Sequence, residues 1–444
     1  MQKFSEDGRP ASTLAGWFAV GALLSAYAVS FLDRQLLTLL VAPIEASLGI
    51  GDAQIGILQG PAFAAFYATM GLPLGWLADR THRARLIAIA IIFWSSMTIA
   101  SGLSSNFTQM LLARFGVGLG EAALVPAAVS LLADLFSAER RALPISIFTC
   151  GLVVGSGLAL TLGGALISFA THSASTLPLL GPFLIGLEPW NIVFICAGLL
   201  GLPVAAIVLL LPEPRAPASA RTPIETRLPI AASIRHVSER REFFLPMLLS
   251  MGGLFVVTTA LSAWFPSVFI RDHGWSGPQT GYALGSVLMV AALCGNLSGG
   301  TVSTWLARRG ARDAVVRTML WGAIVMVPCA GLAAAAPDPR YALAFAAPLY
   351  FSMSVTFGIA PLAFVEMTPA HMRGQIVSLY LLSSNLTGLG IGPPAVGALT
   401  AASASTFEAV GSALAMVCCV AGFPSLVFLN RARRAALRFN SQVA

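Results

Sequence analysis

Four charged side chains stand inside long apolar stretches, where an isolated charge is costly. Of the 19 acidic residues, only Asp33 and Glu121 lie deep in apolar sequence. Arg34 follows Asp33 directly, and Arg114 precedes Glu121 by nearly two helical turns. Because an ion at the depth of a bilayer persists mainly where it is paired or functional, these four residues are our candidates for substrate binding and proton coupling.

The spacing of these residues limits which of them can meet. Arg114 and Glu121 share one face of a helix and lie about 10 Å apart along its axis. Asp33 and Arg34 point about 100° apart, so they cannot both face one partner. Two interpretations stay open: a static Asp33–Arg114 clamp between two helices, or a carboxylate that takes up a proton when its arginine moves away. The five histidines fall in loops or at helix ends, which leaves carboxylates as the proton carriers within the apolar stretches.

The second half of the chain offers polar candidates in place of charged ones, because no ion lies inside its apolar stretches. Thr258, Thr259, Asn296 and Asn385 are the residues in question. Such side chains either line a cavity or hydrogen-bond between neighbouring helices, and the sequence favours neither role.

The sequence argues against a metal site and against enzymatic catalysis. The six cysteines fall within apolar runs and no pair has metal-ligand spacing, so we expect small buried hydrophobes. No histidine pair, no serine or cysteine with a plausible base and no nucleotide-binding loop is found. We therefore expect no enzyme and no resident cofactor, with protons as the coupling ion.

The composition is that of a membrane protein. Apolar residues make up 57% of the 444 residues and charged residues 10%, too few charges for a soluble protein of this length. Apolar runs recur that are long enough to cross a hydrocarbon core of about 30 Å. We predict an all-α membrane protein with twelve transmembrane helices in two pseudo-symmetric six-helix bundles. The expected ranges are 14–42, 53–78, 84–104, 107–135, 142–169, 190–211, 243–270, 279–306, 315–336, 341–367, 374–402 and 408–430.

Two internal repeats divide the chain into halves. Gly71–Arg80 aligns with Gly300–Arg309, and Asp134–Phe148 aligns with Glu366–Tyr380. Loops that recur half a chain apart are typical of a duplicated membrane bundle. A polar segment rich in Pro, Arg and Glu separates the halves. The predicted domains are bundles at 1–211 and 243–430, a cytoplasmic linker at 212–242 and a basic cytoplasmic tail at 431–444.

The placement of arginines predicts the orientation. With both termini cytoplasmic, the inward segments hold all 26 lysines and arginines except Arg34, Arg114, Arg271 and Arg340. These basic residues lie between the spans and form no separate domain, which argues against a nucleic-acid-binding protein. The first span is too long for a signal-peptide core. We expect a multi-pass protein of a bacterial inner membrane.

A short polar loop after residue 74 carries a motif of the major facilitator superfamily, which the whole chain resembles. The matching residues are Gly75, Leu77, Asp79, Arg80 and Arg83. His82 stands where that family has glycine, and Ala84 where it has a second base. The resemblance implies a conformational latch formed by Gly75, Asp79, Arg80 and Arg83. Asp79 would meet the positive end of the helix that begins near Arg373 and hold the cytoplasmic side shut.

Further segments in the first half resemble the Spinster family of proposed lysophospholipid and sphingolipid exporters. They are Phe31–Arg34, Gly75–Arg80, Phe93–Ser95, Arg114–Ala122 and Ala133–Phe136. This resemblance implies a secondary transporter that works by alternating access, coupled to protons, with an amphiphilic lipid as substrate and membrane lipids around it. A monomer is expected.

Three other classes of function are alternatives to lipid transport. A proton-coupled symporter for organic anions or sugar acids is the alternative, because relatives in the same superfamily carry an Asp-Arg pair in the first helix. The absence of a buried base in the second half disfavours a small dianion. A channel or receptor fits the duplicated loops less well, and a membrane enzyme lacks the residues for catalysis.

Overall fold

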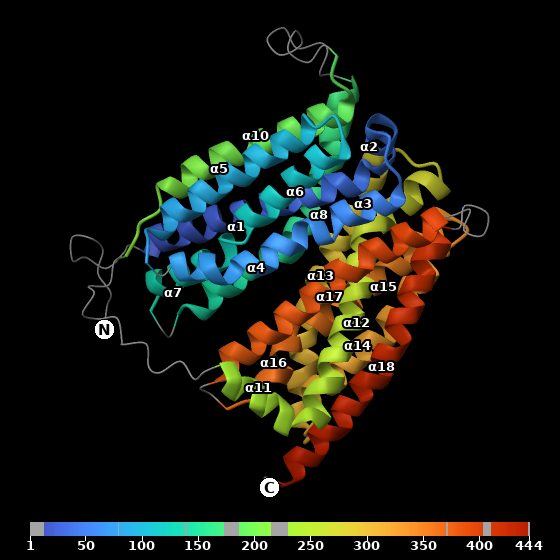
Figure 1. Ribbon diagram of the computed structural model, residues 1–444. Helices are drawn as coiled ribbons and strands as arrows, with labels where there is room; N and C mark the ends of the chain where they lie inside the picture. Colours follow the sequence, from blue (N-terminus) through green and yellow to red (C-terminus); the bar gives the residue numbers. More distant parts are fainter. Residues whose placement is uncertain are drawn as a thin grey trace. The chain divides into compact units, whose positions relative to one another are not determined.

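Helices make up most of the part of the chain that the structure describes (Figure 1). The computed structural model describes residues 13–78, 80–137, 140–172, 186–214, 230–369, 372–402 and 410–442. No β-strand occurs in these ranges. The predicted all-helical architecture is therefore confirmed.

Ten of the described helices are long and apolar enough to cross a membrane, judged by length and composition. They correspond to ten of the predicted spans. The remaining two predicted spans, 53–78 and 374–402, are helical but do not belong to the ten. The count of twelve transmembrane helices stays a prediction.

The chain divides into two compact units. Unit 1 comprises Met1–Pro223 with Ser276–Gly285, and unit 2 comprises Ile224–Trp275 with Ser286–Ala444. The division near residue 223 falls within the predicted linker. Residues 276–285 were expected in the second bundle but group with unit 1, where Gly281 lies against the carbonyl oxygen of Leu160. The predicted domain boundaries stay a prediction.

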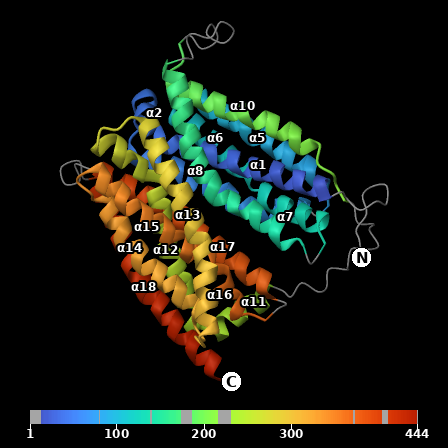
Figure 2. The same ribbon diagram turned by 180° about the vertical axis from the view of Figure 1, so that it is seen from behind.

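Unit 1 is built from long helices and several short ones. They are α1 (Thr13–Leu39), α2 (Val41–Leu48), α3 (Asp52–Gln59), α4 (Pro61–Ala78), α5 (Arg83–Gly102), α6 (Phe107–Glu121), α7 (Leu124–Leu135), α8 (Ala142–His172) and α10 (Pro189–Leu209). Helix α10 lies beside α5, and α1 packs against α8 and α10, as both views show (Figures 1 and 2). The contact of α1 with α8 is close because Gly155 of α8 faces the backbone of Ala28.

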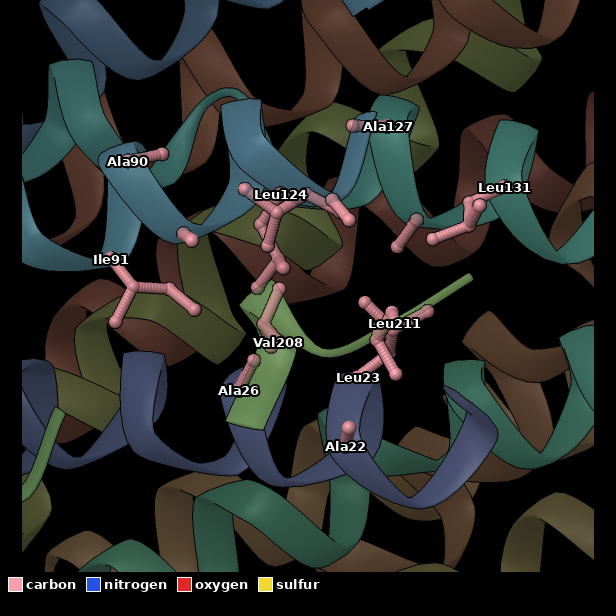
Figure 3. Packing of buried hydrophobic residues seen from close by; sticks show 14 of the residues in the cluster. Ala22, Leu23, Ala26, Ala90, Ile91, Leu124, Ala127, Leu131, Val208 and Leu211 are labelled. Atoms are coloured by element: carbon pink, nitrogen blue, oxygen red, sulfur yellow. The ribbon is translucent and has the colours of Figure 1, made fainter. Parts of the chain in front are cut away.

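The core of unit 1 is formed by small and branched apolar side chains. Figure 3 shows residues of α1, α5, α7 and α10 meeting in one cluster, including Leu23, Ile91, Leu131 and Val208. All four of these side chains are fully buried. Alanines from the same helices fill the space between them, which allows the helices to pack closely.

Three predicted spans are interrupted well inside their length, and a proline stands just after each of these interruptions. Pro61 opens α4 after the break at Gly60, Pro126 lies in the first turn of α7, and Pro361 in the first turn of α16. Proline lacks the N–H that would bond to the carbonyl four residues earlier, and its ring clashes with that carbonyl. The second break follows Glu121 directly, so a candidate carboxylate ends a helix.

Unit 2 contains most of the second half. Its helices are α11 (Ile230–Glu239), α12 (Arg241–Ser267), the π-helical turn η3 (Val268–Asp272), most of α13 (Gly277–Arg308), α14 (Ala314–Ala334), α15 (Pro339–Gly358), α16 (Ala360–Glu366), α17 (Arg373–Ala402) and α18 (Val410–Gln442). Helix α12 packs against α17 and α18, and α14 packs against α15 and α18 (Figure 1).

Two segments of unit 2 are helical outside the predicted spans. The predicted linker contains α11, whose side chains dock on the ends of other helices: His236 lies 3.1 Å from the carbonyl oxygen of Met367. The last helix was expected to end at 430 but continues to Gln442. Its basic continuation stays helical because Ala432 and Ala436 are buried against the rest of unit 2.

Candidate functional site

Two ion pairs join α1 to α6 and contain all four charged candidates. Arg114 donates through Nη1 to Oδ2 of Asp33 and through Nη2, at 3.3 Å, to the backbone carbonyl oxygen of Asp33. Arg34 donates through Nε, at 3.0 Å, and through Nη2 to Oε2 of Glu121. The adjacent residues Asp33 and Arg34 thus face different partners, as their divergent directions on the helix require.

Burial distinguishes the members of this charge cluster. Asp33, Arg114 and Glu121 are buried, whereas the Arg34 side chain is 27% exposed. Asp33 Oδ1, Arg114 Nε and Glu121 Oε1 have no hydrogen-bond partner among the described residues. A buried carboxylate oxygen without a donor is costly, and a proton or a bound polar group would satisfy it. Arg34 is accordingly the most exposed member, and each carboxylate keeps one oxygen without a donor among the described residues.

Aromatic rings surround the guanidinium group of Arg34. Its Cζ atom lies 4.0 Å from the ring centroid of Phe63, 5.0 Å from that of Phe31 and 5.2 Å from that of Tyr67. The rings of Phe63 and Tyr67 stack on each other at 5.0 Å. A cation on an aromatic face is stabilised by about 2 kcal/mol when it is desolvated. The rings therefore hold Arg34 independently of Glu121.

Close packing of helices brings these rings to the charges. Gly118 of α6 lies against the backbone carbonyl of Phe63 in α4, where a Cβ atom would collide. Gly120 lies in the same way against Trp94 of α5. Without side chains at these positions, α6 approaches both helices closely, and the Phe63 ring reaches Arg34. The sequence does not single out Phe63 and Tyr67, since nothing in it pairs them with Arg34.

The predicted latch residues are only partly covered by the structure. Asp79 lies outside the described residues. Gly75 sits in α4 facing Pro126 of α7, and the exposed guanidinium of Arg80 stacks on the Trp76 ring at 3.8 Å. The latch itself stays a prediction.

Arg83 is the centre of a second buried ion cluster, at the start of α5. It donates to Oε1 of Glu213 and to Oδ2 of Asp134, each at 2.7 Å, and to the carbonyl oxygen of Ser130 at 2.9 Å. Glu213 also accepts a hydrogen bond from the backbone N–H of Ala84 at 3.3 Å. These contacts fasten the segment after α10 to the starts and ends of neighbouring helices in unit 1. Sequence analysis did not identify Glu213 or Asp134 as partners.

The polar candidates of unit 2 lie on three helices, α12, α13 and α17. Thr259 donates to the carbonyl oxygen of Gly388 in α17 at 2.7 Å, a contact between helices. Thr258 and Asn385 donate to carbonyl oxygens of their own helices, Phe255 and Leu381. Asn296 lies beside Gly358 of α15. Among the described residues, no hydrogen bond joins any two of the Thr258, Thr259 and Asn385 side chains.

One carboxylate of unit 2 is buried, although no ion lies inside the apolar stretches of this half. Asp313, just before α14, is buried and pairs with Arg317 at 2.8 Å and with Arg433 of α18 at 2.7 Å. It lies at a helix end and outside the apolar stretches. Its burial follows from the continuation of α18 beyond 430, which covers it.

The described residues include no cluster of metal-ligating side chains, and their cysteines differ in exposure. In the described ranges, no group of three or more His, Cys, Asp or Glu side chains is placed to hold a metal ion. Cys294 is exposed rather than buried as expected. It lies on α13, a candidate membrane span, where an exposed apolar side chain would meet lipid.

Comparisons with known proteins identify the family and several relatives. The model of the Major Facilitator Superfamily matches residues 23–386. An MFS-type efflux pump of Mycolicibacterium smegmatis is 25% identical, over 86% of this chain and 84% of that protein. A probable L-galactonate transporter of Escherichia coli is 26% identical, over 65% of this chain and 61% of its own length. A sphingosine-1-phosphate transporter of Danio rerio is 24% identical, over 57% of this chain and 47% of its own length.

A solved structure resembles the chain over nearly its whole length. It is a bacterial homologue of the human lysosomal transporter Spinster, in an inward-facing and unoccupied conformation. The TM-score is 0.79 and the identity 27%, with 97% of this chain and 98% of that chain covered. The resemblance to Spinster proteins predicted from the first half of the sequence is thereby confirmed.

Proposed function

The chain belongs to the Major Facilitator Superfamily, and we propose that it moves an amphiphilic lipid, a lysophospholipid or sphingolipid, across the membrane by proton-coupled alternating access. Its family and fold are those of transporters and not of enzymes. A small-molecule substrate and a multi-pass membrane location follow from the same match.

The single observation that carries the proposal is the charge cluster on α1 and α6. Arg34 is partly exposed and can contact an anionic headgroup, while Glu121 behind it keeps one oxygen without a donor. When Arg34 turns to the headgroup, Glu121 loses its partner and takes up a proton. Asp33 has a mixed role: its pair with Arg114 holds α1 to α6, and its second oxygen is open to a proton.

An amphiphile suits the chemistry around this cluster. The charged candidates lie in one half of the chain, and the candidates in the other half are neutral, namely Thr258, Thr259, Asn296 and Asn385. Aromatic rings border Arg34, so a headgroup bound there has apolar surface beside it for its tail. The relationship to a sphingosine-1-phosphate transporter supports the same substrate class.

A second candidate is a proton-coupled symporter for an organic anion such as a sugar acid. The observation that favours it is the relationship to a probable L-galactonate transporter over 65% of this chain. A sugar acid also carries an anionic group that Arg34 could bind. A sugar acid lacks a long apolar tail, so transport assays with a lysophospholipid and with a sugar acid distinguish the two candidates.

We also propose a membrane topology for the transporter. It has twelve spans in two pseudo-symmetric six-helix bundles, residues 1–211 and 243–430, joined by a cytoplasmic linker and followed by a basic cytoplasmic tail. Both termini face the cytoplasm of a bacterial cell, and the protein acts as a monomer. Gly75, Asp79, Arg80 and Arg83 form a latch that closes the cytoplasmic side.

Counterflow in proteoliposomes tests the function directly. The purified protein is reconstituted in vesicles that contain a pH-sensitive dye, and either a lysophospholipid or a sugar acid is added outside. We expect substrate-dependent proton entry and counterflow with the lysophospholipid only. Counterflow with the sugar acid alone would establish the second candidate, and substrate flux unaffected by a pH gradient would rule out proton coupling.

A further inference from the structure

The outward face of α18 changes abruptly from apolar to basic. Phe423 and Val427 are 51% and 54% exposed, and Pro424 beside them is exposed too. One turn further along the same face stands Arg431, followed by Arg434. Steps of three and four residues keep these side chains in one stripe along the helix.

A shallow groove of about 640 Å³, including its open side, lies along this stripe. Its lining consists of Phe423, Pro424, Val427, Phe428 and Arg431, all from α18. The wall is apolar except at the end where Arg431 stands, with its guanidinium 5.9 Å from the Phe428 ring centroid. The groove thus has a long apolar part and a cationic end.

The two arginines at this end are not used to hold unit 2 together. Arg433, which lies between them in the sequence, turns inward and pairs with Asp313. No described acidic side chain lies within ion-pair distance of Arg431 or Arg434. Their charge is consequently available to an external anion, and α18 is one of the ten helices able to cross a membrane, so this end lies near the level where a span meets water.

We propose that the groove binds an anionic phospholipid of the surrounding bilayer. An acyl chain lies on Phe423, Val427 and Phe428, and the phosphate accepts hydrogen bonds from Arg431 and Arg434. The apolar part of the groove and the two neighbouring arginines together match a phospholipid, whereas a free phosphate would contact the arginines only. The site is separate from the charge cluster on α1 and α6 and takes a resident lipid, not the transported substrate.

Native mass spectrometry of the full-length protein tests the headgroup preference. The protein is incubated with phosphatidylglycerol or with phosphatidylcholine of the same acyl chains. We expect phosphatidylglycerol to bind more tightly, and each arginine to account for about a fivefold change in affinity. The double variant Arg431→Gln/Arg434→Gln should bind both lipids alike, while Arg431→Lys keeps most of the preference. Arg235→Gln, on exposed α11, removes one charge elsewhere and should change nothing.

Photo-crosslinking locates the acyl chain. A phosphatidylglycerol with a diazirine on its acyl chain should label the peptide that contains residues 423–428, and inorganic phosphate in excess should not compete. Equal affinity of the wild-type protein for the two lipids would overturn the proposal. It would also be overturned if the double variant kept the full preference, if the labelling were spread evenly over all spans, or if phosphate displaced the lipid.

Discussion

Arg34 and Phe63 come from different helices, yet the guanidinium carbon of one lies 4.0 Å from the ring centroid of the other. The same guanidinium donates to Glu121. Arg34 therefore has an anionic partner and an aromatic partner at once. Loss of the anionic partner leaves the aromatic contact in place, so the arginine can exchange a carboxylate for a substrate anion without a large movement.

Phe63→Leu should weaken binding of an anionic substrate because it keeps an apolar side chain but removes the aromatic face. We expect an increase of about tenfold in the apparent KM, from the loss of about 1–2 kcal/mol. The apparent KM is measured from transport of the lysophospholipid in proteoliposomes. Phe63→Trp keeps an aromatic face and should retain the low KM, and an equal loss in both variants would indicate packing alone.

Glu121→Gln should fold normally and lose proton-driven transport, because an amide cannot take up the proton. Exchange of substrate across the membrane without net proton movement should persist. Uphill uptake and exchange are measured in the same vesicles under an imposed pH gradient. Glu239→Gln, at an exposed ion pair of α11, is the matched control. Full pH-dependent transport in the Glu121→Gln protein would contradict the proton role.

Arg114→Ala should chiefly reduce stability, because it leaves Asp33 buried without its cation. Breaking a buried pair costs about 3–5 kcal/mol. The double variant Arg114→Ala/Asp33→Asn should recover part of the loss, since no charge is stranded. Thermal unfolding in detergent measures the stability of the single and of the double variant. Asp33→Asn alone should lower the melting temperature and also impair proton-driven transport; unchanged transport would leave Asp33 with the clamp role only.

Glu213→Gln should loosen the segment that follows α10. The carboxylate accepts hydrogen bonds from Arg83 and from the backbone N–H of Ala84 in α5, and an amide forms these contacts less strongly. Faster proteolysis after residue 211 is the expected result. Glu188→Gln, another acid of unit 1 that is exposed, should leave the cleavage rate unchanged. If cleavage is equally slow in both variants, the Arg83 cluster does not anchor this segment.

Asp313→Asn should release the end of α18. Arg433 and Arg317 then lose their shared carboxylate. We expect faster hydrogen exchange in residues 431–442 and little change in α12. Protection that is unchanged in 431–442 would mean that the buried alanines alone keep this end helical.

The sequence singled out the four ions of the charge cluster and suggested the Asp33–Arg114 pair, but it did not predict the Arg34–Glu121 pair. Asp33, Arg34, Arg114 and Glu121 stand out because each is an ion in apolar sequence. Their pairing depends on the rotation of α1 against α6, which spacing within one helix cannot determine. Phe63 is an ordinary aromatic residue in an apolar stretch, and only the close contact at Gly118 brings it to Arg34.

Helix ends were predicted less well than helices. Apolar runs show where a span lies, so the breaks after Gly60 and Glu121 passed unnoticed although Pro61 and Pro126 mark them. The burial of Asp313 was missed for another reason. It depends on α18 remaining helical past its apolar run, which a basic sequence does not suggest.

The two ion pairs on α1 and α6 contain two cations and two anions, so the cluster as a whole is neutral. One proton gives it a single positive charge, which the headgroup of a monoanionic lipid would cancel. A cycle that moves one proton together with one monoanionic lipid carries no net charge, so the membrane voltage would not drive it. A zwitterionic lipid would leave the charge uncompensated, so the voltage dependence of transport reports the charge of the substrate.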